Sequence, residues 1–149
     1  MCSCQMESHG KSTALEGSSM TKISKPVRDI LVRLLLDWVP LDLVVGAFHF
    51  WSPNADASAI RSLTLDGISI MLKSGFVSVG DLGPHGEKFR AWSGDHEEII
   101  AKVRRLWPDG TAAPNIEIVY AVWLEATPAG SSLANSLVDE FNQDCRASE

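Results

Sequence analysis

Apolar residues recur every three or four positions after residue 24, which is the spacing of an amphipathic helix. The members of this stripe are Val27, Ile30, Leu31, Leu34, Leu35 and Trp38. Ser24 is placed to cap the helix, and Pro26 falls in its first turn, where the missing N–H costs nothing. Because Pro40 cannot continue a helix, the pattern predicts a first helix that ends after Val39.

Two further helices are predicted before residue 75. The segment from Leu41 to about Phe48 is nearly all apolar, so a short buried helix is expected there, followed by a turn over residues 49–54. A longer helix is predicted from about residue 56 to residue 74. Its central Gly67 costs about 1 kcal/mol relative to alanine, which a close helix crossing would explain. Gly75 is placed to end this helix in a left-handed conformation.

The second half of the chain mixes strands with helices. Residues 76–79 and 87–92 predict two strands joined by a turn rich in Gly and Pro. Asp95 and Glu98 have the spacing of a capping box at the start of a helix that reaches residue 107. Residues 116–124 are rich in β-branched and aromatic side chains and form the strongest strand candidate.

Thr127 and Pro128 are suited to begin a last helix, whose apolar side chains end at Phe141. We therefore expect one α+β domain over residues 24–141. The polar ends of the chain, residues 1–23 and 142–149, should form a disordered tail and a frayed tail.

This order of elements is the order found in winged-helix domains. The segment 72–80 (Leu-Lys-Ser-Gly-Phe-Val-Ser-Val-Gly) resembles the junction between the third helix and the first wing strand of winged-helix regulators. The segment 122–130 (Val-Trp-Leu-Glu-Ala-Thr-Pro-Ala-Gly) resembles the end of their second wing strand and the start of the next helix.

The chain is also similar to a group of small actinobacterial proteins with W-V-P-L-D near the start and L-T-P-A-G near the end. Here these stretches are Trp38–Asp42 and Ala126–Gly130, and the resemblance covers roughly residues 25–141. It implies a winged-helix-like three-helix core with a small antiparallel β wing and a C-terminal helix. The helix predicted over residues 96–107 would be an insertion in the wing, and these motifs indicate a fold rather than a function.

Charge argues against a general affinity for nucleic acid or for an anionic membrane. The chain carries 13 Lys and Arg against 19 Asp and Glu, for a net charge of −6. Across residues 56–92, which would form the third helix and the wing, four basic side chains are balanced by four acidic ones. A DNA-binding transcriptional regulator is therefore the alternative function, and its candidate DNA contacts are Arg61, Lys73, Lys88 and Arg90.

The sequence contains no recognisable catalytic motif. A nucleophile elbow, a phosphate-binding glycine loop and an HExxH pattern are all absent. The titratable run Asp95-His-Glu-Glu98 is explained by helix capping, since adjacent helical positions point in different directions. We therefore predict no enzymatic activity, no catalytic residues and no bound cofactor.

Cysteine usage and hydropathy indicate the compartment. Cys2, Cys4 and Cys145 have neither zinc-site spacing nor the even count of a disulfide framework, so no metal site is predicted and reduced thiols are expected. No apolar run is long enough for a signal peptide or a membrane span. These features favour a cytoplasmic protein.

The remaining features favour a non-enzymatic protein-binding or regulatory module. Candidate partner-binding residues are the aromatic and neighbouring side chains His49, Phe50, Trp51, Phe89 and Trp92. The acidic surface suits a basic protein partner, because opposite charge speeds association. An immunity or antitoxin-like protein that blocks a basic toxin is one concrete version, and a homodimer is compatible with the same features.

Overall fold

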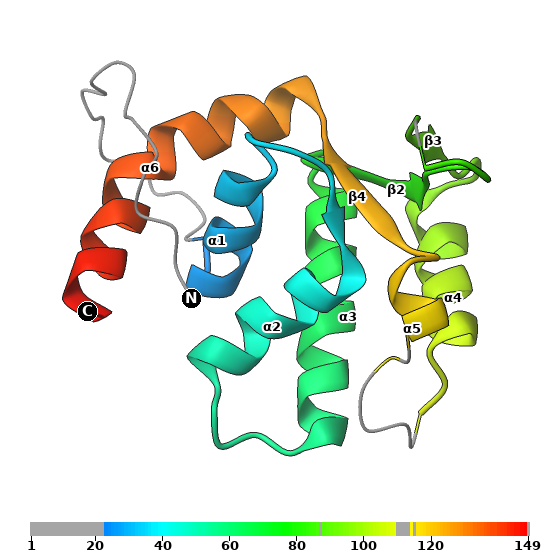
Figure 1. The fold of residues 1–149 in the computed structure, drawn as a ribbon, viewed down its shortest axis with the longest axis horizontal. Coiled ribbons are helices and arrows are strands. Elements are labelled where there is room, and N and C mark those ends of the chain that lie inside the picture. The colour runs from blue at the N-terminus through cyan, green and yellow to red at the C-terminus, as the bar shows by residue number, and fades with distance from the viewer. Residues whose placement is uncertain (1–22, 87, 110–113, 115, 149) are drawn as a thin grey trace.

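The computed structural model describes residues 23–86, 88–109, 114 and 116–148, in which helices alternate with short strands (Figure 1). The helices are α1 (Lys25–Arg33), α2 (Leu41–Trp51), α3 (Ala57–Lys73), α4 (His96–Leu106), α5 (Ile116–Val119) and α6 (Pro128–Ser148). The strands are β1 (Val39–Pro40), β2 (Val77–Asp81), β3 (Arg90–Ala91) and β4 (Trp123–Ala126). The predicted α+β class is confirmed.

Local capping signals place the helix starts. The Ser24 hydroxyl accepts a hydrogen bond from the Val27 N–H of α1, and the Asp56 carboxylate accepts one from the Ala59 N–H of α3. At α4, Asp95 and Glu98 form the predicted capping box, in which each side chain accepts from the backbone N–H of the other. The caps of α1 and α4 depend on residues within one turn of each other, which is why the sequence predicts them.

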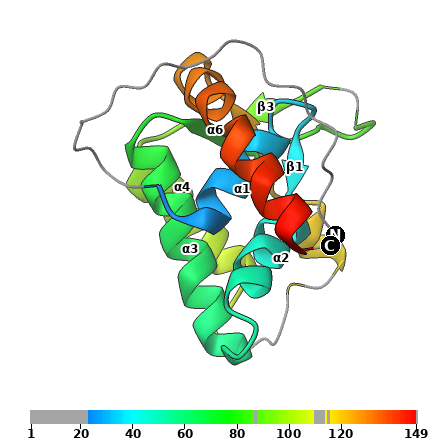
Figure 2. The same cartoon turned by 90° about the vertical axis from the view of Figure 1, so that its left-hand side faces the viewer.

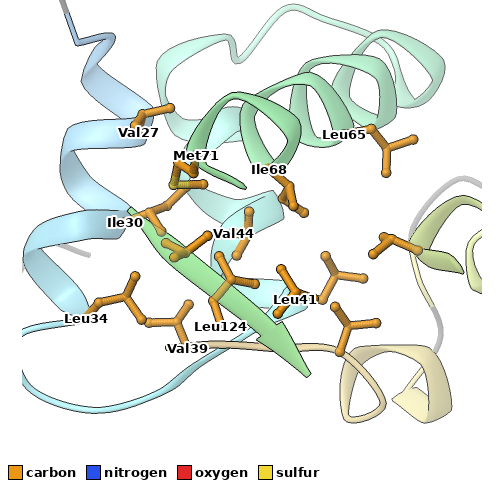
Figure 3. Packing of buried hydrophobic residues seen from close by; sticks show 14 of the residues in the cluster. Val27, Ile30, Leu34, Val39, Leu41, Val44, Leu65, Ile68, Met71 and Leu124 are labelled. Atoms are coloured by element: carbon orange, nitrogen blue, oxygen red, sulfur yellow. The ribbon is translucent and has the colours of Figure 1, made fainter. Parts of the chain in front are cut away.

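The sheet is antiparallel throughout and has the order β1-β4-β2-β3. The last strand in the sequence, β4, lies between β1 and β2, with Leu124 opposite Val39 on one side and Val79 on the other. Leu124 faces the core, where it meets apolar side chains of α1, α2 and α3 (Figure 3). Insertion of β4 therefore joins the two halves of the chain.

The crossing of α2 and α3 confirms the expected role of Gly67. A Cβ atom at this position would overlap the ring of Phe48, which is itself buried in the core. Gly75 has a φ of 77° and ends α3 in the left-handed conformation that the sequence predicts. Both glycines are thus required by the backbone path around α3.

The junction between β4 and α6 rests on the turn between α3 and β2. The Thr127 hydroxyl donates to the Gly75 carbonyl oxygen (2.6 Å) and accepts from the Gly130 N–H (3.0 Å). The Thr127 N–H donates to the Phe76 carbonyl oxygen, and a Cβ on Gly130 would overlap that same oxygen. The two segments that resemble winged-helix regulators therefore contact each other.

The first helix is shorter than predicted. It ends at Arg33, and residues 39–40 form β1 instead of a helix end. The Trp38 indole donates to Glu125, and the Leu41 N–H donates to the Val122 carbonyl oxygen. Contacts with β4 are favoured over continuation of the helix here. Pairing with a strand provides hydrogen-bond partners for backbone groups that would have none beside the proline in a helix.

The strand predicted over residues 116–124 is wrong in its first half. Residues 116–119 form the short helix α5, and only Trp123–Ala126 form β4. The partners of β4 offer pairing positions only opposite residues 123–126, so the preceding β-branched residues have no strand to join. The strand predicted over 87–92 is likewise reduced to Arg90 and Ala91.

The expected full burial of the second helix is also wrong. Helix α2 extends to Trp51, so the predicted turn begins later, and only Leu41, Val44 and Phe48 are buried. These three residues face the core, whereas Leu43 and Phe50 are 43% and 49% exposed. An all-apolar pattern does not reveal which side of a helix lacks a neighbour.

The predicted frayed tail is helical. Helix α6 continues to Ser148, packs along α1 (Figure 2), and buries Phe141, Asn142 and Cys145. Cys145 is disulfide-bonded, which corrects the expectation of reduced thiols at this residue. Most of the predicted N-terminal tail, including Cys2 and Cys4, lies outside the described residues.

Candidate functional site

Helix α2 presents an apolar stripe that runs along its solvent-exposed side and borders the core at Ala47. Leu43, Gly46, Ala47 and Phe50 follow the i, i+3, i+4, i+7 spacing of one helical face. Leu43 and Phe50 are about half exposed, whereas Ala47 is partly buried. Among the described residues, no atom lies within 4 Å of the position that a Cβ on Gly46 would occupy. The stripe is therefore an apolar surface that is open at its centre.

A hollow of about 340 Å³ lies between this stripe and α1. We call it the α1–α2 groove. Its lining consists of Asp29 and Arg33 from α1 and of Leu43, Gly46, Ala47, His49 and Phe50 from α2. Apolar side chains from one helix and polar groups from the other thus border the same depression, a combination typical of surfaces that bind another protein.

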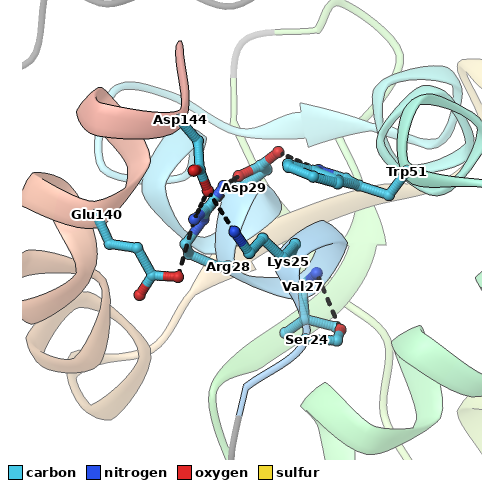
Figure 4. Close-up of polar contacts among 8 residues, drawn as sticks. All are labelled: Ser24, Lys25, Val27, Arg28, Asp29, Trp51, Glu140 and Asp144. Atoms are coloured by element: carbon cyan, nitrogen blue, oxygen red, sulfur yellow. Dashed lines mark hydrogen bonds and ion pairs between the residues drawn. The ribbon is translucent and has the colours of Figure 1, made fainter. Parts of the chain in front are cut away.

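A buried ionic cluster holds the two walls of the groove in place (Figure 4). Arg28 of α1 is only 1% exposed, and its guanidinium donates to Asp29, Glu140 and Asp144. The other carboxylate oxygen of Asp29 accepts a hydrogen bond from the Trp51 indole (2.8 Å). Arg28 therefore joins α1 to α6, while Asp29 joins α1 to the end of α2.

The pKa values in this cluster follow from its hydrogen bonds. Burial opposes the charge of Arg28, but hydrogen bonds to Asp144, Asp29 and Glu140 outweigh it and raise the pKa of the guanidinium. The pKa of Asp144 is lowered, first by its hydrogen bond from Lys25 and then by that from Arg28. Both shifts favour the charged forms of Arg28 and Asp144.

The structure separates the three residues predicted at the end of α2. His49 and Phe50 are exposed and line the α1–α2 groove. Trp51 is turned away and half-buried, with its ring 5.7 Å from the Arg28 guanidinium and edge-on to Phe50. Trp51 thus supports the groove rather than lining it.

The other two predicted partner-binding residues belong to a different region. Phe89 stacks on Trp38 with ring centroids 6.3 Å apart. The Trp92 indole donates to Asp81, and Lys102 lies 4.1 Å from the centre of its ring. Both aromatics are half-buried, and neither lines the α1–α2 groove.

Three of the four candidate DNA contacts are engaged within the protein. Arg61 is mostly buried, donates to the Trp107 carbonyl oxygen (2.9 Å) and lies over the Trp107 ring. Lys73 lies 3.9 Å from Glu97, and Arg90 pairs with Asp81 at 2.9 Å. The hydrogen bond from Arg90 is the main reason why the pKa of Asp81 is lowered. Lys88 is exposed.

Sequence reasoning missed Leu43, Gly46 and Ala47. The apolar run from Leu41 to Phe48 predicted burial on every side, so its outward-facing members were not considered as a surface. Gly46 is the residue that could have indicated this surface. A glycine destabilises the interior of a helix, so its presence there suggests either a close neighbour or an open surface.

Within the described ranges, no group of three or more His, Cys, Asp or Glu side chains could hold a metal ion. No helix among those residues is long and apolar enough to cross a membrane. Comparison with protein-family models, with curated proteins and with solved structures gives no match to this chain.

Proposed function

We propose that this protein is a protein-binding or regulatory module without enzymatic activity, built on a winged-helix scaffold. The order α1-β1-α2-α3-β2 followed by β4 supports the scaffold, as does the antiparallel arrangement β1-β4-β2. In this arrangement β2 and β4 are the wing strands, α3 takes the place of the third helix, and the segment with β3, α4 and α5 is inserted in the wing.

The observation that carries the proposal is the α1–α2 groove. Leu43 and Phe50 of its apolar stripe are solvent-exposed, although the Trp51 indole joins the end of α2 to Asp29 of α1, which also pairs with the buried Arg28. Exposed apolar surface costs free energy in water, and a rigid surface loses little entropy when a partner covers it. The groove is therefore suited to protein contact, with Phe50 as the aromatic anchor.

DNA binding remains the second candidate, but the face of α3 gives it little support. Leu63, Asp66 and Ile70 are all exposed on this helix, so its outer surface combines apolar groups with a carboxylate. Helix α4 packs beside α3, and Lys73 near the end of α3 pairs with Glu97 of α4. Phosphate contacts would have to displace such internal pairs.

Capture with matched baits tests the proposal. The wild-type chain and Gly46→Trp are used as baits in native lysate, because Gly46 lines the groove and the position of its Cβ is clear of the other described residues. Ile70→Trp is the control, since Ile70 is exposed on α3 outside the groove. A protein that binds wild type and Ile70→Trp but not Gly46→Trp, and that rebinds after purification, is the expected result.

Two outcomes would contradict the proposal. If no bait recovers a protein, the proposal that this chain binds another protein is contradicted. Equal recovery by wild type and by Gly46→Trp would show that the groove is not the binding surface. A heterologous basic partner, such as the toxin of an immunity pair, should in addition bind less tightly as salt increases, because the net charge of this chain is −6.

A further inference from the structure

The stripe on α2 has a symmetry that its individual residues do not suggest. Along the helix its members are large, small, small and large: Leu43, Gly46, Ala47 and Phe50. The pattern is the same in both directions about the Gly46–Ala47 peptide. A second α2 helix laid antiparallel over this centre would place Leu43 opposite Phe50 of the second copy, and Gly46 opposite Ala47 of the second copy.

This arrangement fits the steric requirements of helix packing. The two small residues meet at the centre, where they let two backbones approach closely, and each bulky end covers the bulky end of the other helix. A two-fold contact requires that residue i meets j and that j meets i, and the stripe satisfies this condition. The open space above Gly46 is where the second helix would enter.

The charges beside the stripe agree with the antiparallel direction. Asp42 and His49 are both exposed and lie seven residues apart, so they share one edge of α2. A two-fold axis through the centre of the stripe brings Asp42 of each copy near His49 of the other. An imidazole N–H can donate to a carboxylate there.

We propose that the α1–α2 groove is a two-fold interface between two copies of this chain, with their α2 helices packed antiparallel through Leu43, Gly46, Ala47 and Phe50. This inference rests on the proposed function and deepens it, because it names a second copy as the protein that occupies the groove.

Sedimentation velocity of the purified full chain, over micromolar to submillimolar concentrations, tests the proposal. The wild type is expected at twice the monomer mass. Phe50→Asp places a charge in the interface and is expected to be monomeric. Ile70→Asp is the matched control, since Ile70 and Phe50 are 55% and 49% exposed, and it is expected to remain dimeric. Gly46→Trp provides an independent block of the groove whose added atoms point into open space.

The response to salt separates a second copy from a basic partner. Two copies with a net charge of −6 repel each other, so added salt should strengthen or preserve the dimer. A monomeric wild type, or a dimer that survives both Phe50→Asp and Gly46→Trp, would overturn the inference. The proposed function would still stand if a monomeric wild type captured a different protein through the groove, and it would fail if nothing bound there.

Discussion

Two glycines in the middle of helices have opposite surroundings. In the part of the chain that the structure describes, no atom lies within 4 Å of the position that a Cβ on Gly46 of α2 would occupy, whereas the same position at Gly67 of α3 overlaps the Phe48 ring. Alanine is the better helix former by about 1 kcal/mol. The surroundings of each glycine therefore decide whether its replacement by alanine raises or lowers the free energy of unfolding.

We expect Gly46→Ala to raise the free energy of unfolding by about 0.5–1 kcal/mol. Gly67→Ala should lower it, because overpacking typically costs about 1–3 kcal/mol and exceeds the gain in helix propensity. Urea unfolding of both variants in dilute solution measures the two values.

A double variant provides the control for the Gly67 prediction. The variant Gly67→Ala/Phe48→Leu replaces the ring by a smaller side chain. Its free energy of unfolding should fall by less than the sum of the losses in the two single variants, because the two residues are in contact. Additive losses, or a stabilising Gly67→Ala, would mean that the Phe48 ring does not require a glycine at residue 67.

At the scale of elements, α6 is joined to α1 by apolar packing and by ions. Val32 of α1 packs with Val138, Phe141 and Cys145 of α6, and the Arg28 cluster lies beside them. A buried ion pair adds little net stability when it is complete, but removal of one partner leaves an uncompensated charge. The cluster therefore specifies how α6 is placed more than it stabilises the fold.

Acidification should weaken this attachment through Asp144. Its pKa is lower in the folded chain than in the unfolded chain, so the stability it contributes is present above the unfolded value and is lost as pH falls through the folded value. Glu140 and Asp29 face the same guanidinium. We expect the wild type to be more stable than Asp144→Asn at neutral pH, and this difference to shrink as pH falls below about 5.

Thermal unfolding of both proteins at a series of pH values measures this difference. Asp139→Asn is the control, because Asp139 is exposed on the same helix. A difference between wild type and Asp144→Asn that stays constant down to the acid limit would show that the Asp144 charge does not stabilise the docked helix.

At the scale of the whole molecule, net charge and the face of α3 lead to one expectation about DNA. Arg61 is bound to the Trp107 carbonyl oxygen, Lys73 and Arg90 each lie beside a carboxylate, and the chain carries a net charge of −6. Non-specific DNA binding depends on phosphate neutralisation by such cations. We therefore expect no retardation of duplex DNA at low salt in a gel-shift assay.

Charge variants on α3 test in the same assay whether this helix can reach DNA. Asp66→Lys should create measurable salt-dependent retardation if α3 is accessible to a groove of DNA, because it changes the charge of the helix face by two units. Retardation by the wild type at low salt that is lost in Arg61→Gln or Lys88→Gln would favour the regulator over the protein-binding module.

Much of the helical structure follows from short-range sequence signals. The caps at Ser24 and Asp95 and the left-handed Gly75 act within one turn, so composition and spacing suffice to predict them. His49 and Phe50 were also identified as candidate contact residues from their position beside a turn signal.

Only the tertiary structure decided the strands and the groove. Pairing of β4 with β1 and β2 selected residues 39–40 and 123–126 as strands and left residues 116–119 helical, because a strand needs a partner at each position. Likewise, an apolar helix becomes a surface only where no other element covers it. The sequence by itself determined where α1, α2, α4 and α6 begin and which classes of chemistry lack a motif. Long-range packing determined that Leu43, Gly46 and Phe50 are left exposed, since burial depends on neighbours that are distant in sequence.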